Sequence, residues 1–259
     1  MSTVAYIEGI AYWSRGLPSW AAAREHAAGA EPAADAPARP SPQLLPANER
    51  RRAPETVAVA LEVALAACQS AGRDPATLAS VFASAHGDLA ITDYMCTTLA
   101  SEPRAVSPTR FHNSVHNAAA GYWTIGAGCM RAATAISAGQ ASFAQGLIEA
   151  LAQLGDGAQA VLLVGYDGES VGALGTVTPS AGLLGGALVL SRTPRAGAVR
   201  LHARLRDGEA DDGGTLSRRA QGNAMAPMLS LFDALAGAAA RVGLAAGAGR
   251  VLELELGHD

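Results

Sequence analysis

The chain is organised around a strand, a tight turn and a helix that follow one another between residues 132 and 154. The β-prone run 132–137 leads into the turn Ala-Gly-Gln-Ala-Ser at 138–142, and the helix-prone run 141–154 leaves it. Many enzymes hold a nucleophile in such a turn, because the free N–H groups and the dipole at the start of the helix favour negative charge. The residue at the tip here is Gln140, whose amide forms hydrogen bonds but is no nucleophile.

Runs of strand and helix type alternate along most of the chain. Strands are predicted from apolar and β-branched runs, at residues 3–13, 78–84, 132–137, 159–166, 185–191, 199–206 and 251–256. Helices are predicted from the spacing of apolar side chains and from helix-prone composition, at residues 20–26, 54–71, 89–101, 117–128, 141–154 and 228–242. This alternation predicts an α/β layered domain with a mixed sheet.

Three of the predicted strands indicate how the sheet is built. Residues 159–166, Gln-Ala-Val-Leu-Leu-Val-Gly-Tyr, are apolar on both faces, as central parallel strands are. The neighbouring strands at 185–191 and 199–206 are expected to form an antiparallel hairpin.

Two irregular loops are expected within one domain that spans residues 1–259. Residues 28–48 contain five prolines and little apolar pattern, which predicts a surface loop. Residues 207–226 are polar and rich in glycine, which predicts a mobile loop, and the stretch between 101 and 114 is also expected to be loop-like. No internal repeat divides the chain.

Composition excludes several classes of function. A formal net charge of −4 argues against a nucleic-acid partner. The N-terminus lacks the pattern of a signal peptide, and no apolar run approaches the roughly 18 residues of a membrane span. The three cysteines are far apart, with no Cys-x-x-Cys pair, so neither a disulfide framework nor a zinc site is predicted and a cytoplasmic location is expected.

Other groups in the sequence are candidates for chemistry. Ser114 lies between His112 and His116, and a Ser–His pair in a loop would support hydrolysis of a thioester; no acidic partner is identifiable, and the alternative is ordinary packing. The two histidines are four residues apart, but a third metal ligand is not evident, so no metal is predicted. Ser142, just past the tip, is expected to hydrogen-bond locally.

Two further features have both a functional and a structural interpretation. The triplet Arg50-Arg51-Arg52 precedes a helix and would bind a phosphate, such as that of a carrier protein's prosthetic arm, or else form a solvated helix entry. His86, in the sequence Ala-His-Gly-Asp, would lie near the site of His112 and His116 or serve as a structural cap.

The segment Asn-Ala-Ala-Ala-Gly at 117–121, the strand that follows it and the turn at 138–142 together resemble the N-terminal half of a β-ketoacyl synthase of the thiolase superfamily. The resemblance extends over roughly residues 3–206. It implies a thiolase-like layered fold with a mixed five-stranded-type sheet and helices. In that family a cysteine occupies the tip, and here the position holds Gln140. The chain has about half the length of a synthase, so we expect the second thiolase half, with its two histidines, to be absent.

This combination resembles the chain length factors of type II polyketide and aryl polyene pathways. It implies a non-condensing accessory subunit that pairs with a ketosynthase and an acyl carrier protein, as a homodimer or heterodimer and without a cofactor. The resemblance also implies that the strand before the turn pairs across the dimer interface, and that Asn117, Tyr122 and Phe143 line an acyl pocket. A carrier-protein-binding scaffold without chemistry is the remaining alternative.

Overall fold

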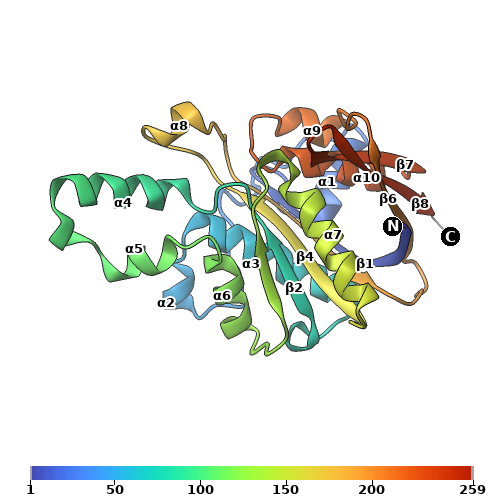
Figure 1. Cartoon of the computed structure of the whole chain (residues 1–259), viewed down its shortest axis with the longest axis horizontal. Helices are drawn as coiled ribbons and strands as arrows, with labels where there is room; N and C mark the ends of the chain where they lie inside the picture. Colours follow the sequence, from blue (N-terminus) through green and yellow to red (C-terminus); the bar gives the residue numbers. More distant parts are fainter. Residues whose placement is uncertain (1, 258–259) are drawn as a thin grey trace.

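The computed structural model describes residues 2–257 and is built on one mixed sheet of eight strands (Figure 1). The strands, in chain order, are β1 (Ser2–Ser14), β2 (Ala79–Ala83), β3 (Ala133–Ile136), β4 (Ala160–Asp167), β5 (Leu184–Ser191), β6 (Val199–Asp207), β7 (Arg241–Gly247) and β8 (Arg250–Gly257). Across the sheet their order is β3-β2-β4-β5-β1-β6-β8-β7. β2 is parallel to both β3 and β4, and the other neighbouring pairs are antiparallel.

Helices connect the strands and cover both faces of the sheet. The α-helices are α1 (Trp20–Ala27), α2 (Ala47–Arg50), α3 (Glu55–Ala71), α4 (Leu89–Ser101), α5 (Pro108–Asn113), α6 (Ala118–Gly126), α7 (Ser142–Gly155), α8 (Leu174–Val177), α9 (Thr215–Arg219) and α10 (Leu229–Ala236). Short 3₁₀ helices are η1 (Pro75–Thr77), η2 (Pro103–Ala105), η3 (Gly139–Ala141) and η4 (Ala226–Met228). None of the helices within residues 2–257 is both long and apolar enough to cross a membrane.

β4 lies between two hydrophobic cores, as its apolar composition predicts. Val161 and Leu163 belong to the core that contains α7 and α10. Leu162 and Val164 point the other way, into the core formed by α3 and α6. Because side chains alternate along a strand, a strand with helices on both faces has to be apolar at successive positions.

Three C-terminal strands extend the expected five-stranded arrangement. The strands β3-β2-β4-β5-β1 form the five-stranded part, and β6, β8 and β7 continue it from the other edge of β1. Leu244 and Leu254 of these added strands lie in the same core as Leu147 of α7. The Gln145 side chain of α7 also donates a 2.8 Å hydrogen bond to the Ala246 carbonyl of β7. The helix α7 is therefore packed against β2 and β4 and also against β7.

The expected hairpin between residues 185–191 and 199–206 does not form. β1 lies between these two strands and is antiparallel to both, because its 13 residues offer an edge on each side. The helix predicted over 228–242 ends at Ala236, and β7 begins at Arg241, where alanine and glycine had obscured the strand pattern. The stretch before Ser114 contains the helix α5, which begins at Pro108 with a Ser107 side-chain cap.

The segment 207–226 is not the irregular loop expected from its composition. It contains α9, and the Asp233 carboxylate of α10 accepts N–H hydrogen bonds from Gly214, Leu216 and Ser217 at 2.7–3.0 Å. Leu216 is fully buried beneath it. The Asp233 carboxylate, which is distant in sequence and half-buried, therefore holds in place a segment whose composition predicts a mobile loop. Residues 28–46 do lack regular structure, and the short helix α2 starts at Ala47.

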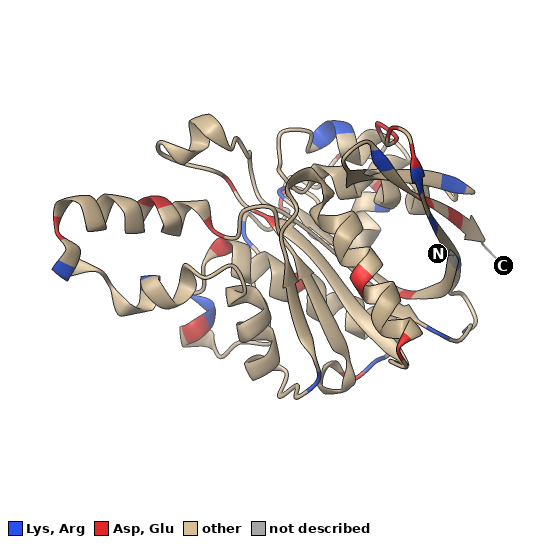
Figure 2. Ribbon diagram, in the orientation of Figure 1, with Lys and Arg blue, Asp and Glu red and all other residues tan. Residues whose placement is uncertain are grey.

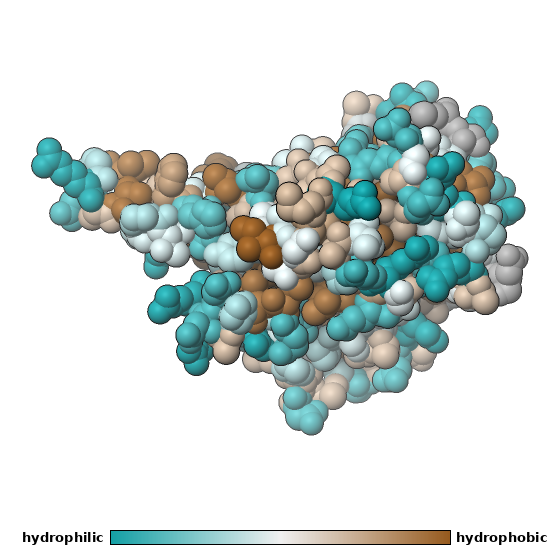
Figure 3. Space-filling model, turned by 90° about the horizontal axis from the view of Figure 1, so that it is seen from below, coloured by the Kyte–Doolittle hydropathy of each residue, from teal (hydrophilic) through white to brown (hydrophobic). Residues whose placement is uncertain are grey.

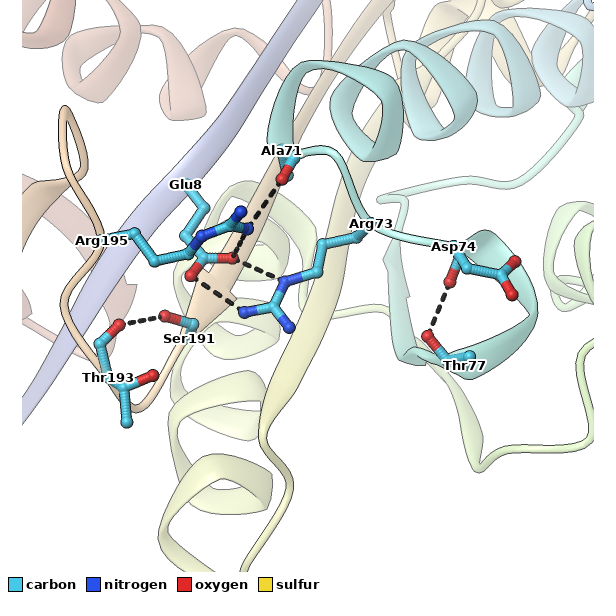
Figure 4. Close-up of polar contacts among 8 residues, drawn as sticks. All are labelled: Glu8, Ala71, Arg73, Asp74, Thr77, Ser191, Thr193 and Arg195. Carbon is cyan, nitrogen blue, oxygen red and sulfur yellow. Dashed lines mark hydrogen bonds and ion pairs between the residues drawn. The ribbon is translucent and has the colours of Figure 1, made fainter.

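A buried ion pair joins β1 to the end of α3 (Figure 4). The register of β1 against β5 shifts between Ile7 and Gly9, which makes Glu8 the extra residue of a bulge. Its side chain is 2% exposed and accepts two hydrogen bonds from Arg73, at 2.8 and 3.0 Å. Arg195 lies 3.6 Å from the same carboxylate and also donates to a main-chain carbonyl at the end of α3.

The strands β6 and β8 carry ion pairs of a different, more exposed kind. Charges of both signs are interspersed there (Figure 2), and Arg206 pairs with Glu253 at 2.8 Å while Arg250 pairs with Asp207 at 2.9 Å. These side chains are substantially solvent-exposed, so each pair contributes little to stability.

Candidate functional site

The turn between β3 and α7 is tight and is held by local hydrogen bonds. Gly139 has a φ of 55°, a conformation that favours glycine. The buried hydroxyl of Ser142 accepts a 2.9 Å hydrogen bond from the Ala138 N–H and donates to the Gly139 carbonyl at 2.7 Å. Ser142 therefore closes the turn locally, and the exposed tip is occupied by Gln140.

A second turn, at residues 84–88 after β2, lies beside the first. The Ser137 hydroxyl donates a 3.0 Å hydrogen bond to the Ala85 carbonyl and connects the two turns. Asp167, fully buried at the end of β4, accepts hydrogen bonds from the Ser84 hydroxyl at 2.6 Å and from the N–H groups of Ala85 and His86 at 2.8 and 3.2 Å. Burial raises the pKa of Asp167 more than these hydrogen bonds lower it.

Asp167 was not identified from the sequence. The sequence does contain a signal for it, since an acidic residue ends the apolar run of β4, at the carboxyl edge of the parallel strands. Its role depends on β2 and β4 being neighbours, and strand order is not readable from one sequence.

Gln140 and His86 line the same cleft, which has a volume of about 630 Å³. Residues 177–179 and 221–227 form its other side. Two of its hydroxyl groups are already donors within the protein: Thr178 to the Leu174 carbonyl at 2.8 Å and Ser217 to the Asp233 carboxylate at 2.7 Å. An amide and an imidazole can hydrogen-bond a carbonyl group, whereas an acyl-accepting thiol is absent from the lining residues.

The structure does not arrange His112, Ser114 and His116 as a nucleophile with its base. The Ser114 hydroxyl donates to a backbone carbonyl at 2.8 Å, and no hydrogen bond among residues 2–257 joins it to either histidine. His116 Nε2 is 2.9 Å from the Ser84 carbonyl, and the ring of His112 contacts that of Tyr122. The part of the chain that is described also contains no group of three or more histidine, cysteine or acidic side chains suited to a metal ion.

The three residues expected to line an acyl pocket do not share one cavity. Asn117 and Tyr122 line a separate cleft of about 730 Å³, together with His112 and Ile125. Phe143 is 2% exposed and packs in the core, with its ring 6.2 Å from that of Phe232. It lines neither this cleft nor the one at the turn, because the side chain points from α7 toward β4 and α10.

The two edges of the sheet differ in accessibility. At β7, the N–H and C=O groups of Gly243 both bond to Asp211, and the Ala246 carbonyl accepts from Gln145. At β3, the carbonyls of residues 132 and 136 bond to β2, so the backbone groups of Ala133 and Ala135 face outward. No strand within residues 2–257 pairs with this edge of β3.

Exposed apolar side chains lie on segments that precede β3 in the chain, of which α6 contacts β3. They lie on α5, on α6 and in the connections that follow each helix: Phe111 is 60% exposed, Val115 48%, Ile125 82% and Met130 96%. Figure 3 shows apolar side chains on this lower side of the molecule. An exposed apolar surface beside an unpaired strand is typical of a protein interface.

Comparisons with known proteins agree with this geometry. The family described as Beta-ketoacyl synthase, N-terminal domain, matches residues 20–246. The ketosynthase ApeO in complex with its chain length factor ApeC, from Xenorhabdus doucetiae, includes a chain that is 23% identical, with a TM-score of 0.77 and coverage of 97% of this chain and 99% of that one. The ishigamide ketosynthase/chain length factor gives 17% identity and a TM-score of 0.74, covering 98% and 99%.

A longer homologous structure shares the fold over part of its length. A β-ketoacyl synthase from Burkholderia phymatum is 17% identical, with a TM-score of 0.59, and the match covers 91% of this chain and 71% of that one. No curated protein matches the sequence. At these identities the solved structures indicate a common fold, and the thiolase-like fold implied by the sequence is confirmed.

Proposed function

The chain belongs to the β-ketoacyl synthase N-terminal domain family, and from this membership we propose that it is a non-condensing accessory subunit, similar to a chain length factor. Its partner would be a ketosynthase of a type II polyketide or fatty-acid-like pathway, such as one for aryl polyenes, with an acyl carrier protein delivering substrates. We place it in the cytoplasm, where its three free cysteines would stay reduced.

The observation that carries this proposal is Gln140 at the tip of an intact turn. A condensing enzyme needs a thiolate at this place to accept the acyl group, with helix N–H groups stabilising the oxyanion. The tight turn from β3 into α7 supports the proposal, because its tip would hold such a nucleophile, and the glutamine side chain there cannot be acylated in that way. Retention of the turn without the nucleophile favours binding and shaping over condensation.

The open edge of β3 supports a partner that adds a strand there. Ala133 and Ala135 have small side chains, so another backbone can approach closely, and the exposed apolar residues of α5 and α6 would be covered at the same time. The ketosynthase of the neighbouring structures is paired with a chain length factor, which is the arrangement proposed for this chain.

The proposed interface is tested with Ala135→Pro. Because the Ala135 N–H faces away from β2, proline removes an intermolecular donor without removing a bond of the sheet. We expect native mass spectrometry of wild-type protein mixed with the ketosynthase encoded beside it to show a one-to-one complex, and the proline variant to lose it. Ala135→Ser, which keeps the N–H, is the matched control and should still pair.

Activity assays separate the proposal from its alternatives. Condensation of acyl and malonyl carrier substrates by the isolated protein would refute an accessory role. Hydrolysis of acyl thioesters that is lost in His116→Ala would indicate a thioesterase. Binding of carrier protein without any complex with the ketosynthase would indicate a scaffold.

A further inference from the structure

A cleft of about 770 Å³ lies apart from the turn at Gln140, among the beginnings of α3 and α4, the helix α5 and the segment 168–183. In Figure 1, α4 and α5 extend from the body as an arm, and the cleft is at the base of that arm. Its volume is within the range of sites that hold small organic ligands, roughly 300–1,000 Å³.

Four arginines from separate parts of the chain line this cleft: Arg15, Arg39, Arg52 and Arg110. Only Arg52 belongs to the triplet at 50–52. The triplet therefore does not act as a unit, since Arg51 bonds to Asn48 and the side-chain Nε of Arg50 is buried. The convergence arises from the fold.

The guanidinium groups are only partly balanced by carboxylates. Arg39 pairs with Glu55 at 2.9 Å. Within residues 2–257, the side chains of Arg15, Arg52 and Arg110 have no carboxylate within 4 Å. Like charges are gathered in one cleft of a chain whose net charge is −4, which favours an anionic ligand there.

The remaining carboxylates of the lining do little to offset this charge. Asp88 already accepts hydrogen bonds from the Thr56 hydroxyl at 2.7 Å and the Ile91 N–H at 2.9 Å. Glu169 is exposed on the far wall. The guanidinium of Arg110 is held over the ring of Tyr94, 4.0 Å from its centre, so its direction is fixed without a counter-charge.

The other walls of the cleft are suited to an organic group. Ile91, Leu183 and Val171 contribute apolar surface, and Pro54 is the N-cap of α3, whose first turn has no side-chain cap. Guanidinium groups bind phosphate in a bidentate manner, and the uncapped N–H groups of α3 add a favourable field for the same charge.

We propose that this cleft binds the phosphate of a phosphopantetheine-type arm, with Arg15, Arg52 and Arg110 on the phosphate and the apolar walls on the organic chain. The choice of this arm rests on the proposed function, because carrier proteins and coenzyme A both present it. The arginine cleft itself is separate from the proposed ketosynthase interface at β3.

The test is isothermal titration of the whole protein with 4′-phosphopantetheine and with unphosphorylated pantetheine. We expect the phosphorylated compound to bind at least about tenfold more tightly than pantetheine, which is the effect of about one charge-assisted contact. Its binding should weaken as salt is added. The double variant Arg15→Gln/Arg52→Gln should bind 4′-phosphopantetheine about tenfold or more weakly than the wild type. Arg204→Gln, which changes an exposed arginine on β6, is the control and should bind as the wild type does.

Three results would overturn the proposal: equal binding of pantetheine, unchanged binding by the double variant, or inorganic phosphate binding as tightly as phosphopantetheine. Coenzyme A and carrier protein with and without its arm, used as further titrants, distinguish the two sources. Ketosynthase pairing is measured on the same variants. If the wild type does not pair with the ketosynthase, the proposed function is contradicted, while the titrations test the cleft independently.

Discussion

Glu8 and Asp167 are two buried carboxylates whose surroundings act on their charge in opposite ways. Burial by itself raises the pKa of both. For Glu8, the hydrogen bonds and charge of Arg73, with Arg195 nearby, outweigh burial and lower the pKa below its ordinary value. Asp167 has no guanidinium beside it, and its pKa is raised. The two residues therefore make opposite predictions for stability against pH.

Replacing Glu8 with Gln should lower the free energy of unfolding by about 2 kcal/mol at pH 7, because the buried partner of Arg73 is lost. A carboxylate with a lowered pKa stabilises the fold above its unfolded pKa of about 4.3, and this contribution is lost as the pH falls through the folded pKa. Denaturant unfolding should therefore show that the free energy of unfolding falls less between pH 7 and pH 3 for the variant than for the wild type.

The control for Glu8 is the surface pair of Arg206 and Glu253. Glu253→Gln should change the free energy of unfolding by less than about 1 kcal/mol, since both side chains are reached by water. Equal losses in the two variants would contradict a special role for the buried pair.

Replacing Asp167 with Asn should disturb the turn that carries His86. The amide NH₂ of asparagine would face an N–H or hydroxyl donor from which the carboxylate now accepts a hydrogen bond. This should lower the free energy of unfolding by about 1–3 kcal/mol. With a raised pKa, the charge of Asp167 destabilises the fold progressively as the pH rises through the folded pKa. The deficit of the variant relative to the wild type should therefore narrow as the pH rises. Chemical denaturation of both proteins across pH 3–8 measures this, and a constant or widening deficit would contradict the assignment.

At the level of elements, the position of α7 depends on a glycine of β4. A Cβ added to Gly165 would lie 2.6 Å from the Phe143 ring and 2.8 Å from Met228 Sδ. Gly165→Ala should therefore lower the free energy of unfolding by about 1–3 kcal/mol, by forcing α7 away from the sheet. Gly121→Ala in α6 is the control, because nothing lies within 4 Å of its added Cβ and alanine favours a helix.

The test for Gly165 is thermal unfolding of the single variants and of Gly165→Ala combined with Phe143→Leu. The smaller side chain should recover part of the loss. Independent, additive effects of the two changes would show that the contact between α7 and β4 does not set the position of the helix.

For the whole molecule, local sequence patterns predict the structure correctly where residues that are close in sequence also contact one another in space. The apolar run of β4 and the turn at 138–142 were predicted correctly, because each depends on its own residues. The insertion of β1 between β5 and β6 was not, since it requires an edge contributed from the other end of the chain.

The candidate site was limited by the same distinction. Spacing alone placed His112, Ser114 and His116 together, yet the end of α5 turns their side chains toward different partners. Asp167 and the arginine cleft depend on contacts between segments far apart in sequence. The composition of such sites depends on side-chain direction and strand order, and a local sequence pattern predicts neither.

The unequal edges of the sheet determine how many neighbours the molecule can accept through its strands. At β7, Asp211 bonds to both backbone groups of Gly243, and Gln145 bonds to the Ala246 carbonyl, whereas at β3 no strand within residues 2–257 pairs with the outward backbone groups of Ala133 and Ala135. If a partner adds a strand to this sheet, we expect it to do so at β3, where backbone groups face outward, and less readily at β7. We therefore expect strand addition to give a pair and not a filament.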